Sequence, residues 1–283
     1  MPLYPTKELL DDAKARKYGV GYYNAVNMEM TRALIRAAED MKSPIIIGTA
    51  EGLLKYGDFE WIAPMMQSAA RNAKVPVAIH LDHAYKYDTV MKALRHGFGS
   101  VMFDGSVLPL EKNIEISAEI SKAAHAMGAG VESELGKVGG LEEGNGLIGR
   151  NHLTDVDEAA DFVEKTNVDF LAISIGTTHG VYEEVPNLDL DRLAEIRSKV
   201  DVPLVLHGGS GLTKEVFRNC IEYGIQKINI HTDNVSAAIN IIREKAKDMD
   251  YPELLKKTEE EMYNVVVDKI ITFGSGDKAG SDN

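Results

Sequence analysis

Short apolar runs alternate along this chain with longer segments whose apolar residues recur at helical spacing. Each run is rich in β-branched and aliphatic residues and is too short for a helix, which indicates a buried strand. Eight such strands are predicted, at about residues 19–26, 44–50, 75–83, 100–106, 128–136, 168–176, 202–209 and 225–232. Because a helical segment follows each strand, the pattern predicts an α/β fold, a (β/α)8 TIM barrel.

The helices that follow these strands are predicted at about residues 28–41, 58–73, 88–96, 110–127, 155–166, 189–199, 214–223 and 234–247. Two further helices, about residues 7–17 and 253–271, lie outside this count as an N-terminal addition and a C-terminal extension. We expect one domain over residues 1–283, with a disordered polar tail at about 274–283. Residues 137–152 are too glycine-rich for a helix, and a loop of that length usually acts as a lid or a binding loop.

A doubly wound open sheet is the alternative to the barrel. Polar residues gather at the carboxyl ends of nearly all the predicted strands. A barrel builds its site from the ends of many strands, whereas an open sheet collects polar residues around one switch point. This distribution therefore favours the barrel.

Composition narrows the protein class. The 283 residues suit one barrel, and no apolar run approaches the ~20 residues that span a bilayer. A net charge of −13 argues against nucleic-acid binding, which needs a basic face. The only cysteine, Cys220, excludes an internal disulfide, and the amino terminus lacks the apolar core of a signal peptide. We expect a cytoplasmic protein with neither a membrane nor a nucleic-acid partner.

Three predicted strands end in a histidine: His83, His179 and His207. Each of these alone could be a hydrogen-bonded rim residue. Together they suit zinc, which binds imidazole nitrogens and keeps a position open for substrate in catalytic sites. His80, in contrast, is expected in the wall of its strand.

Carboxylates form a second group at the predicted barrel mouth. Asp82 adjoins His83, so it could donate or accept a proton beside a metal-bound substrate. Glu142, on the glycine-flanked loop, could enter when that loop closes. Surface solvation is the expectation for Glu143 and for Glu132, which we expect to face away from Glu134 along their strand.

Glycines and hydroxyls form a third group, suited to a phosphate. Backbone N–H groups at Gly180, Gly208 and Gly209 can approach an anion closely, and Ser210 adds a hydroxyl. Asn229 and Thr232 follow at the end of the eighth strand. Barrels often hold phosphate in the loops after strands seven and eight.

These motifs resemble those of the class II, zinc-dependent fructose-bisphosphate aldolases and their tagatose-bisphosphate relatives. The likeness runs from about Leu9 to Ala279 through YNAVNMEM, GTAEGLLKY, VAIHLDHA, SVMFDGS, VESELGKVGGLEE, IGTTHGVY, LVLHGGSG and KINIHTD. The resemblance implies reversible cleavage of a ketose 1,6-bisphosphate, or a related ketose 1-phosphate, into dihydroxyacetone phosphate and an aldehyde such as glyceraldehyde 3-phosphate. A metal-stabilised enediolate would be the intermediate.

The resemblance also implies residue roles. His83, His179 and His207 match the zinc ligands, Asp82 the acid at the aldehyde oxygen, and Glu142 the loop acid that handles the proton on the dihydroxyacetone phosphate carbon. Asp104 and Glu134 match an alternative or resting metal site. Substrate contacts are expected from Asn24, Thr49, Gly180, Gly208, Gly209, Ser210, Asn229, His231 and Thr232. The family also uses a monovalent cation, Na⁺ or K⁺, near that phosphate, and its members are commonly homodimers or homotetramers.

The chain departs from the family pattern at the distal end of the substrate. His231 replaces an aspartate linked to sugar recognition, and Val235 replaces an arginine that binds the distal phosphate in some members. No lysine follows His179–Gly180 as it does in some members, and Lys227 lies inside a strand, which disfavours a Schiff-base mechanism. Three alternatives remain: an aldolase for a different distal group, such as a deoxy-keto-gluconate phosphate; a non-aldolase metal-dependent sugar-phosphate enzyme; or a silent sugar-phosphate-binding protein.

Overall fold

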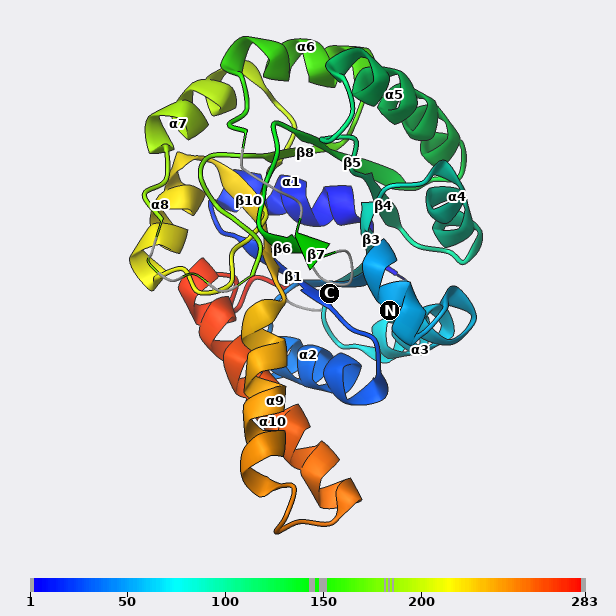
Figure 1. Ribbon diagram of the computed structural model, residues 1–283, viewed down its shortest axis with the longest axis vertical. Helices are drawn as coiled ribbons and strands as arrows, with labels where there is room; N and C mark the ends of the chain where they lie inside the picture. Colours follow the sequence, from blue (N-terminus) through cyan, green and yellow to red (C-terminus); the bar gives the residue numbers. More distant parts are fainter. Residues whose placement is uncertain are drawn as a thin grey trace.

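Eight parallel strands form a closed barrel in the computed structural model, which describes residues 3–142, 146–147, 152–180, 182, 184 and 186–280, the backbone alone at 141, 142, 146 and 147. The order around the ring is β1, β2, β3, β4, β5, β8, β9, β10, and β10 pairs back with β1 (Figure 1). The strands are β1 Val20–Asn24, β2 Ile45–Ala50, β3 Val77–Ala84, β4 Ser100–Phe103, β5 Gly130–Leu135, β8 Phe170–Ile173, β9 Leu204–Leu206 and β10 Ile225–Ile230. The predicted (β/α)8 barrel is confirmed.

Helices surround this ring, one after nearly every strand (Figure 1). They are α1 Thr6–Arg16, α2 Met28–Asp40, α3 Phe59–Asn72, α4 Tyr87–Arg95, α5 Leu110–Ala126, α6 Val156–Thr166, α7 Leu190–Lys199, α8 Lys214–Tyr223, α9 Thr232–Lys245 and α10 Tyr251–Phe273. A 3-10 helix, η1 Glu51–Tyr56, follows β2, and the predictions did not include it. Side chains of Asn27, Asp155 and Thr213 accept hydrogen bonds from the first turns of α2, α6 and α8, which fixes where these helices begin.

The last helix is the predicted C-terminal extension beyond the eight helices that follow the strands. α10 packs against α2, α8 and β1 and buries Met262, Val266 and Ile270. It therefore covers the seam where the ring closes. The preceding helix, α9, leaves the ring and extends away from it beside the far part of α10 (Figure 1).

The two faces of each strand lie in different surroundings because side chains alternate along a strand. In β3, Val77, Ile79 and Leu81 join the large apolar layer between strands and helices, whereas Ala78 points into the ring. A smaller apolar cluster fills one end of the interior, and Leu9, Leu10 and Ala13 of α1 close it. The helix predicted before the first strand thus plugs the amino-terminal end of the barrel.

Two segments qualify the predictions. In the 137–152 loop, the short strands β6 Leu141–Glu142 and β7 Gly146–Leu147 pair antiparallel. The expectation of a disordered tail is wrong for residues 274–280, because Ser275 is buried and hydrogen-bonds Ser43, while the backbone of Asp277 and Ala279 donates to the end of α2.

Among the described residues, no helix is long and apolar enough to cross a membrane.

Candidate active site

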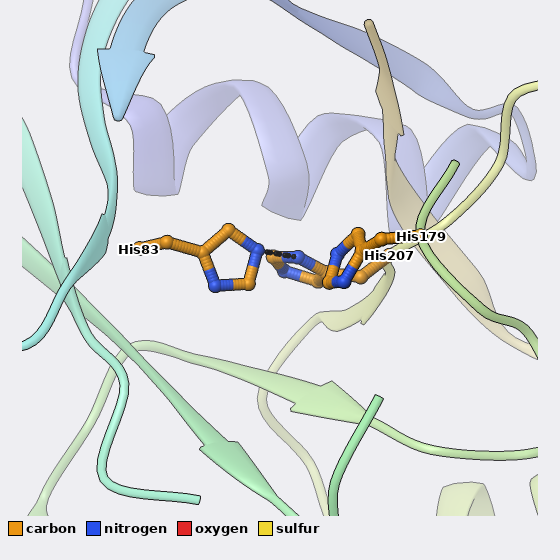
Figure 2. A group of neighbouring side chains, drawn as sticks. All are labelled: His83, His179 and His207. Carbon is orange, nitrogen blue, oxygen red and sulfur yellow. Dashed lines mark hydrogen bonds between the residues drawn. The ribbon is translucent and has the colours of Figure 1, made fainter. Parts of the chain in front are cut away.

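Three histidines converge at the carboxyl ends of their strands, as predicted. His83 lies near the end of β3, His207 directly follows β9, and His179 lies in the segment after β8 (Figure 2). One ring nitrogen of each histidine lies within 4.8 Å of those of the other two. His83 Nε2 and His207 Nδ1 are 2.7 Å apart.

Carboxylates fix the orientation of two of these rings. Asp104 Oδ2 lies 3.0 Å from His83 Nδ1, and Glu132 Oε1 lies 2.9 Å from His207 Nε2. The remaining nitrogens of both rings face each other at the cavity. Neither ring nitrogen of His179 has a hydrogen-bond partner among the described residues.

The pKa values of the residues around the three histidines favour a bound cation. Burial lowers the pKa of both His179 and His207 well below the ordinary value, and the neighbouring His83 lowers each of them further. Burial alone would raise the pKa of Asp104, but the hydrogen bonds from His83 and Ser106 outweigh it and leave that pKa below its usual range. Three imidazoles that direct a nitrogen toward one point are the donor set of a zinc-type site, so the arrangement of these residues fits a divalent metal ion.

Asp82 lies beside this cluster on the inward face of β3. Asn229 Nδ2 donates to both of its carboxylate oxygens, at 3.1 and 3.0 Å, and also lies 3.3 Å from His207 Nδ1. Asp82 is 2% exposed and lines the same cavity as His83 and His179. A carboxylate at this place can exchange a proton with a substrate oxygen at the cavity.

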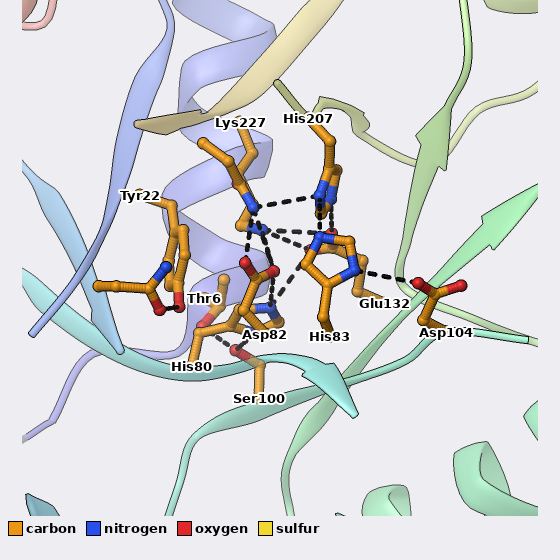
Figure 3. A network of polar contacts seen from close by, with 12 residues as sticks. Thr6, Tyr22, His80, Asp82, His83, Ser100, Asp104, Glu132, His207 and Lys227 are labelled. Atoms are coloured by element: carbon orange, nitrogen blue, oxygen red, sulfur yellow. Dashed lines mark hydrogen bonds and ion pairs between the residues drawn. The ribbon is translucent and has the colours of Figure 1, made fainter. Parts of the chain in front are cut away.

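The interior beneath Asp82 corrects one expectation. Glu132 was expected to be solvated and to face away from Glu134, but it is fully buried inside the barrel. Residues two apart on a strand point to the same face, so both carboxylates face inward. Lys227 Nζ lies 2.9 Å from Glu132 Oε2, and a chain of contacts continues through His80 and Ser100 to Thr6 (Figure 3).

Asp104 and Glu134 form a second possible ligand set with His83. One oxygen or nitrogen of each lies within 4.8 Å of the others. Glu134 Oε1 accepts the backbone N–H of Val138, and Asp104 Oδ1 accepts that of Ser106. The residues predicted for an alternative metal site are therefore brought together.

Glycines form the wall opposite Asp82. Gly208 has φ +65°, and a Cβ there would lie 2.4 Å from the Thr178 carbonyl oxygen. A Cβ on Gly209 would lie 2.8 Å from the carbonyl oxygen of Asn229. Ser210 Oγ accepts the backbone N–H groups of His231 and Asp233 at the start of α9. Backbone at a helix start beside unhindered glycines is a suitable place for a phosphate.

The remaining predicted contacts divide into two groups. Asn24, Gly180, His231 and Thr232 line the cavity. Thr49 is fully buried but does not line it, because alternation along β2 places Thr49 on the outward face with Ile45 and Ile47. The Glu142 backbone lies in β6, and its side chain is outside the described residues, as is Glu143.

Two residues of the site were not predicted. Tyr22 lines the cavity, and its hydroxyl donates to Asn24 Oδ1 at 2.7 Å. Lys227 lies below it, with Nζ 4.6 Å from the Tyr22 ring centre. The alternation of β1 and β10 was the available signal, since both residues stand two positions before a predicted contact, Asn24 or Asn229.

Comparisons with known proteins agree with this geometry. A family model described as fructose-bisphosphate aldolase class-II matches residues 4–278. The fructose-bisphosphate aldolase of Thermus caldophilus is 39% identical over 300 residues, covering 96% of this chain and 98% of that protein. That of Geobacillus stearothermophilus is 39% identical over 289 residues, with 99% of each chain covered.

A solved structure supports the same relation. The YdjI aldolase from Escherichia coli K12 superimposes with a TM-score of 0.88 at 35% identity, covering 98% of this chain and 100% of that one. The chain therefore belongs to the class-II fructose-bisphosphate aldolase family, whose members are metal-dependent aldehyde-lyases that act on phosphorylated sugars and form dihydroxyacetone phosphate.

Proposed function

We propose that this protein is a zinc-dependent aldolase that reversibly cleaves a ketose 1-phosphate or 1,6-bisphosphate into dihydroxyacetone phosphate and an aldehyde. The observation that carries the proposal is the convergence of His83, His179 and His207 beside Asp82 in one cavity. His83, His179 and His207 would hold the ion. A bound zinc ion would supply Lewis-acid polarisation of the substrate carbonyl.

Asp82 is assigned the role of transferring the proton at the aldehyde oxygen. In the cleavage direction the carboxylate takes the proton of the hydroxyl on the carbon that becomes the aldehyde, and in synthesis it returns that proton. Asn229 holds both carboxylate oxygens and so keeps Asp82 oriented toward the cavity. Glu142 is assigned the proton on the dihydroxyacetone phosphate carbon; its backbone belongs to the loop that reaches His179 through the Gly140 bridge.

The phosphate of dihydroxyacetone phosphate is assigned to the glycine wall. Backbone N–H groups of Gly180 and Gly208, with the hydroxyls of Ser210 and Thr232, would bind its oxygens at the start of α9. Gly209 lines the same wall, but its own N–H donates to the Asn229 carbonyl oxygen at 3.2 Å. A monovalent cation, Na⁺ or K⁺, is proposed beside the same phosphate. In the folded chain Ser210 already accepts two backbone N–H groups there, so it orders the anion site as well as lining it.

The distal end of the substrate is the part we expect to differ from fructose 1,6-bisphosphate. No lysine or arginine belongs to the described lining of the cavity. Burial lowers the pKa of His231 to about 4, so its ring is neutral near neutral pH. A distal phosphate would therefore lack a charge-assisted partner from these residues, a bond worth roughly 1.5–3 kcal/mol.

Substrate comparison tests this part. We expect fructose 1,6-bisphosphate to be cleaved less well than a ketose phosphate with a different distal group, by about 10- to 150-fold in kcat/KM. His231→Asp should shift the ranking among fructose 1,6-bisphosphate, tagatose 1,6-bisphosphate and ketose 1-phosphates. The specificity proposal fails if fructose 1,6-bisphosphate is the best substrate and the substitution leaves the ranking unchanged.

Metal removal tests the chemistry itself. Chelation should abolish release of dihydroxyacetone phosphate in a coupled assay, and added zinc should restore it, because His83, His179 and His207 supply the donor set. Full cleavage by a demonstrably metal-free sample would contradict the proposal. Cleavage restored by another divalent ion but not by zinc would leave the aldolase assignment and reject zinc.

Assembly is a separate proposal. We expect a homodimer or homotetramer, and the exposed apolar side chains of Val235 and Ile239 on the projecting helix α9 offer a contact surface. Light scattering at micromolar concentration checks it. A monomer would reject this part alone.

A further inference from the structure

An ammonium group, that of Lys227, lies inside the barrel below the metal-binding histidines (Figure 3). Lys227 is fully buried, and its Nζ lies 2.9 Å from Glu132 Oε2, 3.2 Å from Glu132 Oε1 and 3.8 Å from Asp82 Oδ1. Its charge also lies over the ring of Tyr22. The contacts given above for the aldolase chemistry do not use this residue.

Glu132 connects the ammonium group to the metal site. The same oxygen, Oε1, lies 2.9 Å from His207 Nε2 and within hydrogen-bond distance of Lys227 (Figure 3). A ring whose Nε2–H donates to a carboxylate presents Nδ1, with its lone pair, to the opposite side. For His207 that side is the cavity, where Nδ1 lies 2.7 Å from His83 Nε2.

The surroundings show why an ammonium group belongs here. His80, Asp82 and Glu132 bring one ligand atom each to within 4.8 Å of one another, all buried. Two carboxylates so close together in a dry interior need a positive partner. Lys227 provides that charge from β10, and it does so with a donor that also fixes the direction of Glu132.

We propose that Lys227 is a positioning residue of the metal centre, which holds Glu132 in the orientation that presents Nδ1 of His207 to the ion. The inference rests on the metal site of the proposed function and deepens it. It differs from a merely structural role, in which the Lys227–Glu132 pair would only neutralise charge in the core and leave metal affinity untouched.

The test measures zinc affinity without substrate. Zinc-free protein is titrated with zinc against a chromophoric chelator, for the wild type, Lys227→Met and Glu132→Gln. Loss of a residue that orients a metal ligand typically weakens metal binding by about 10- to 100-fold, and we expect that loss in both variants. The cobalt-substituted proteins should show altered visible absorption bands, since the His207 ring would be held less firmly.

Lys269→Met is the matched control. Lys269 is also largely buried, pairs with Asp233 at 2.7 Å and lies over an aromatic ring, that of Phe217, but does not contact the metal-binding histidines. Its substitution should lower thermal stability and leave zinc affinity unchanged. A loss of zinc affinity in Lys227→Met no larger than in Lys269→Met would overturn the inference.

A double variant keeps the test decisive if Lys227→Met does not fold. Lys227→Met with Glu132→Gln removes both charges of this pair, and the remaining buried carboxylate, Asp82, keeps its two hydrogen bonds from Asn229. Because Lys227 acts through Glu132, the double variant should bind zinc as Glu132→Gln does, with no additional loss. A further loss, or wild-type affinity in Glu132→Gln, would overturn the inference. A wild type that binds zinc but releases no dihydroxyacetone phosphate contradicts the proposed function instead.

Discussion

The outward and inward faces of the same barrel strands follow different rules. In β3, the outward Val77, Ile79 and Leu81 belong to the large apolar cluster, whereas the inward His80 and Asp82 belong to a network of buried charges. The outward layer is continuous around the ring. The inward layer is apolar only at the end that α1 closes and polar toward the carboxyl ends of the strands.

This difference separates the residues that stabilise the fold from those that perform the chemistry. Outward side chains gain free energy by leaving water, roughly in proportion to the apolar area buried. Burial of the inward carboxylates and imidazoles costs the free energy of their hydration. Hydrogen bonds and ion pairs to specific partners such as Asn229 and Lys227 offset that cost. Outward substitutions should therefore change the free energy of unfolding, and inward substitutions should change zinc affinity or kcat.

The largest effect is expected at Asp82. Asp82→Ala removes the proposed proton-transfer group and should lower kcat by roughly 10²- to 10⁴-fold, the usual range for general acid–base catalysis. Zinc content, measured on the purified variant, should not change. Asp82→Asn preserves the shape of the side chain and should lose activity to a similar degree. If zinc is lost together with activity, Asp82 supports the metal and its catalytic assignment is wrong.

A substitution on the outward side should lower the stability of the fold and leave the metal site unchanged. Phe162 of α6 is fully buried in the layer between helices and strands and does not line the cavity of the site. Phe162→Ala should lower the free energy of unfolding by about 3–5 kcal/mol. Urea denaturation measures this loss, and zinc affinity of the folded variant should equal that of the wild type. A change in zinc affinity as large as that expected for Glu132→Gln would remove the distinction between the two faces.

The smallest predicted effect depends on pH and concerns His231. Burial lowers its pKa to about 4, compared with about 6.5 in an unfolded chain. Its contribution to stability is therefore full above about pH 6.5 and is lost as the pH falls toward 4, because the unfolded chain binds a proton that the folded chain excludes. The loss is about 3 kcal/mol by proton linkage. Denaturation of the wild type and of His231→Gln across this range isolates it, since the difference in unfolding free energy should vary with pH.

A pH-independent difference between these two proteins would show that His231 titrates normally. It would then be solvated in the folded state, and the neutral distal subsite inferred for the substrate would lose its support. The pH dependence of unfolding therefore also tests the proposed substrate specificity, independently of the kinetic comparison of substrates.

Periodicity predicted the outward face well because that face obeys a general rule. Apolar residues at strand and helix spacing located all eight barrel strands, and α8 was predicted with the bounds the structure has. The role of α10 could not be predicted, because its apolar pattern shows that one side is buried without showing which strands it covers. The packing of residues 274–280 could not be predicted either, because Ser275 is held by hydrogen bonds and not by the burial of apolar area.

The inward face was predicted only where residues stand at strand ends. His83, His179 and His207 could be located from their positions after apolar runs, and the structure brings them together. Glu132 was not located, because a charged residue within a strand usually indicates a solvated face. For Lys227, the alternation along β10 marked the inward side but did not identify its partner. Their partnership joins β5 to β10, and a pairing across so many residues leaves no mark in a local pattern.

Synthesis of the chain gives the closing strand a further significance. β10 completes the ring by pairing with β1, and the ribosome makes β1 long before β10. The same strand carries Lys227 and Asn229, with His231 directly after it. A nascent chain therefore cannot close its barrel before these three residues of the site have been synthesised.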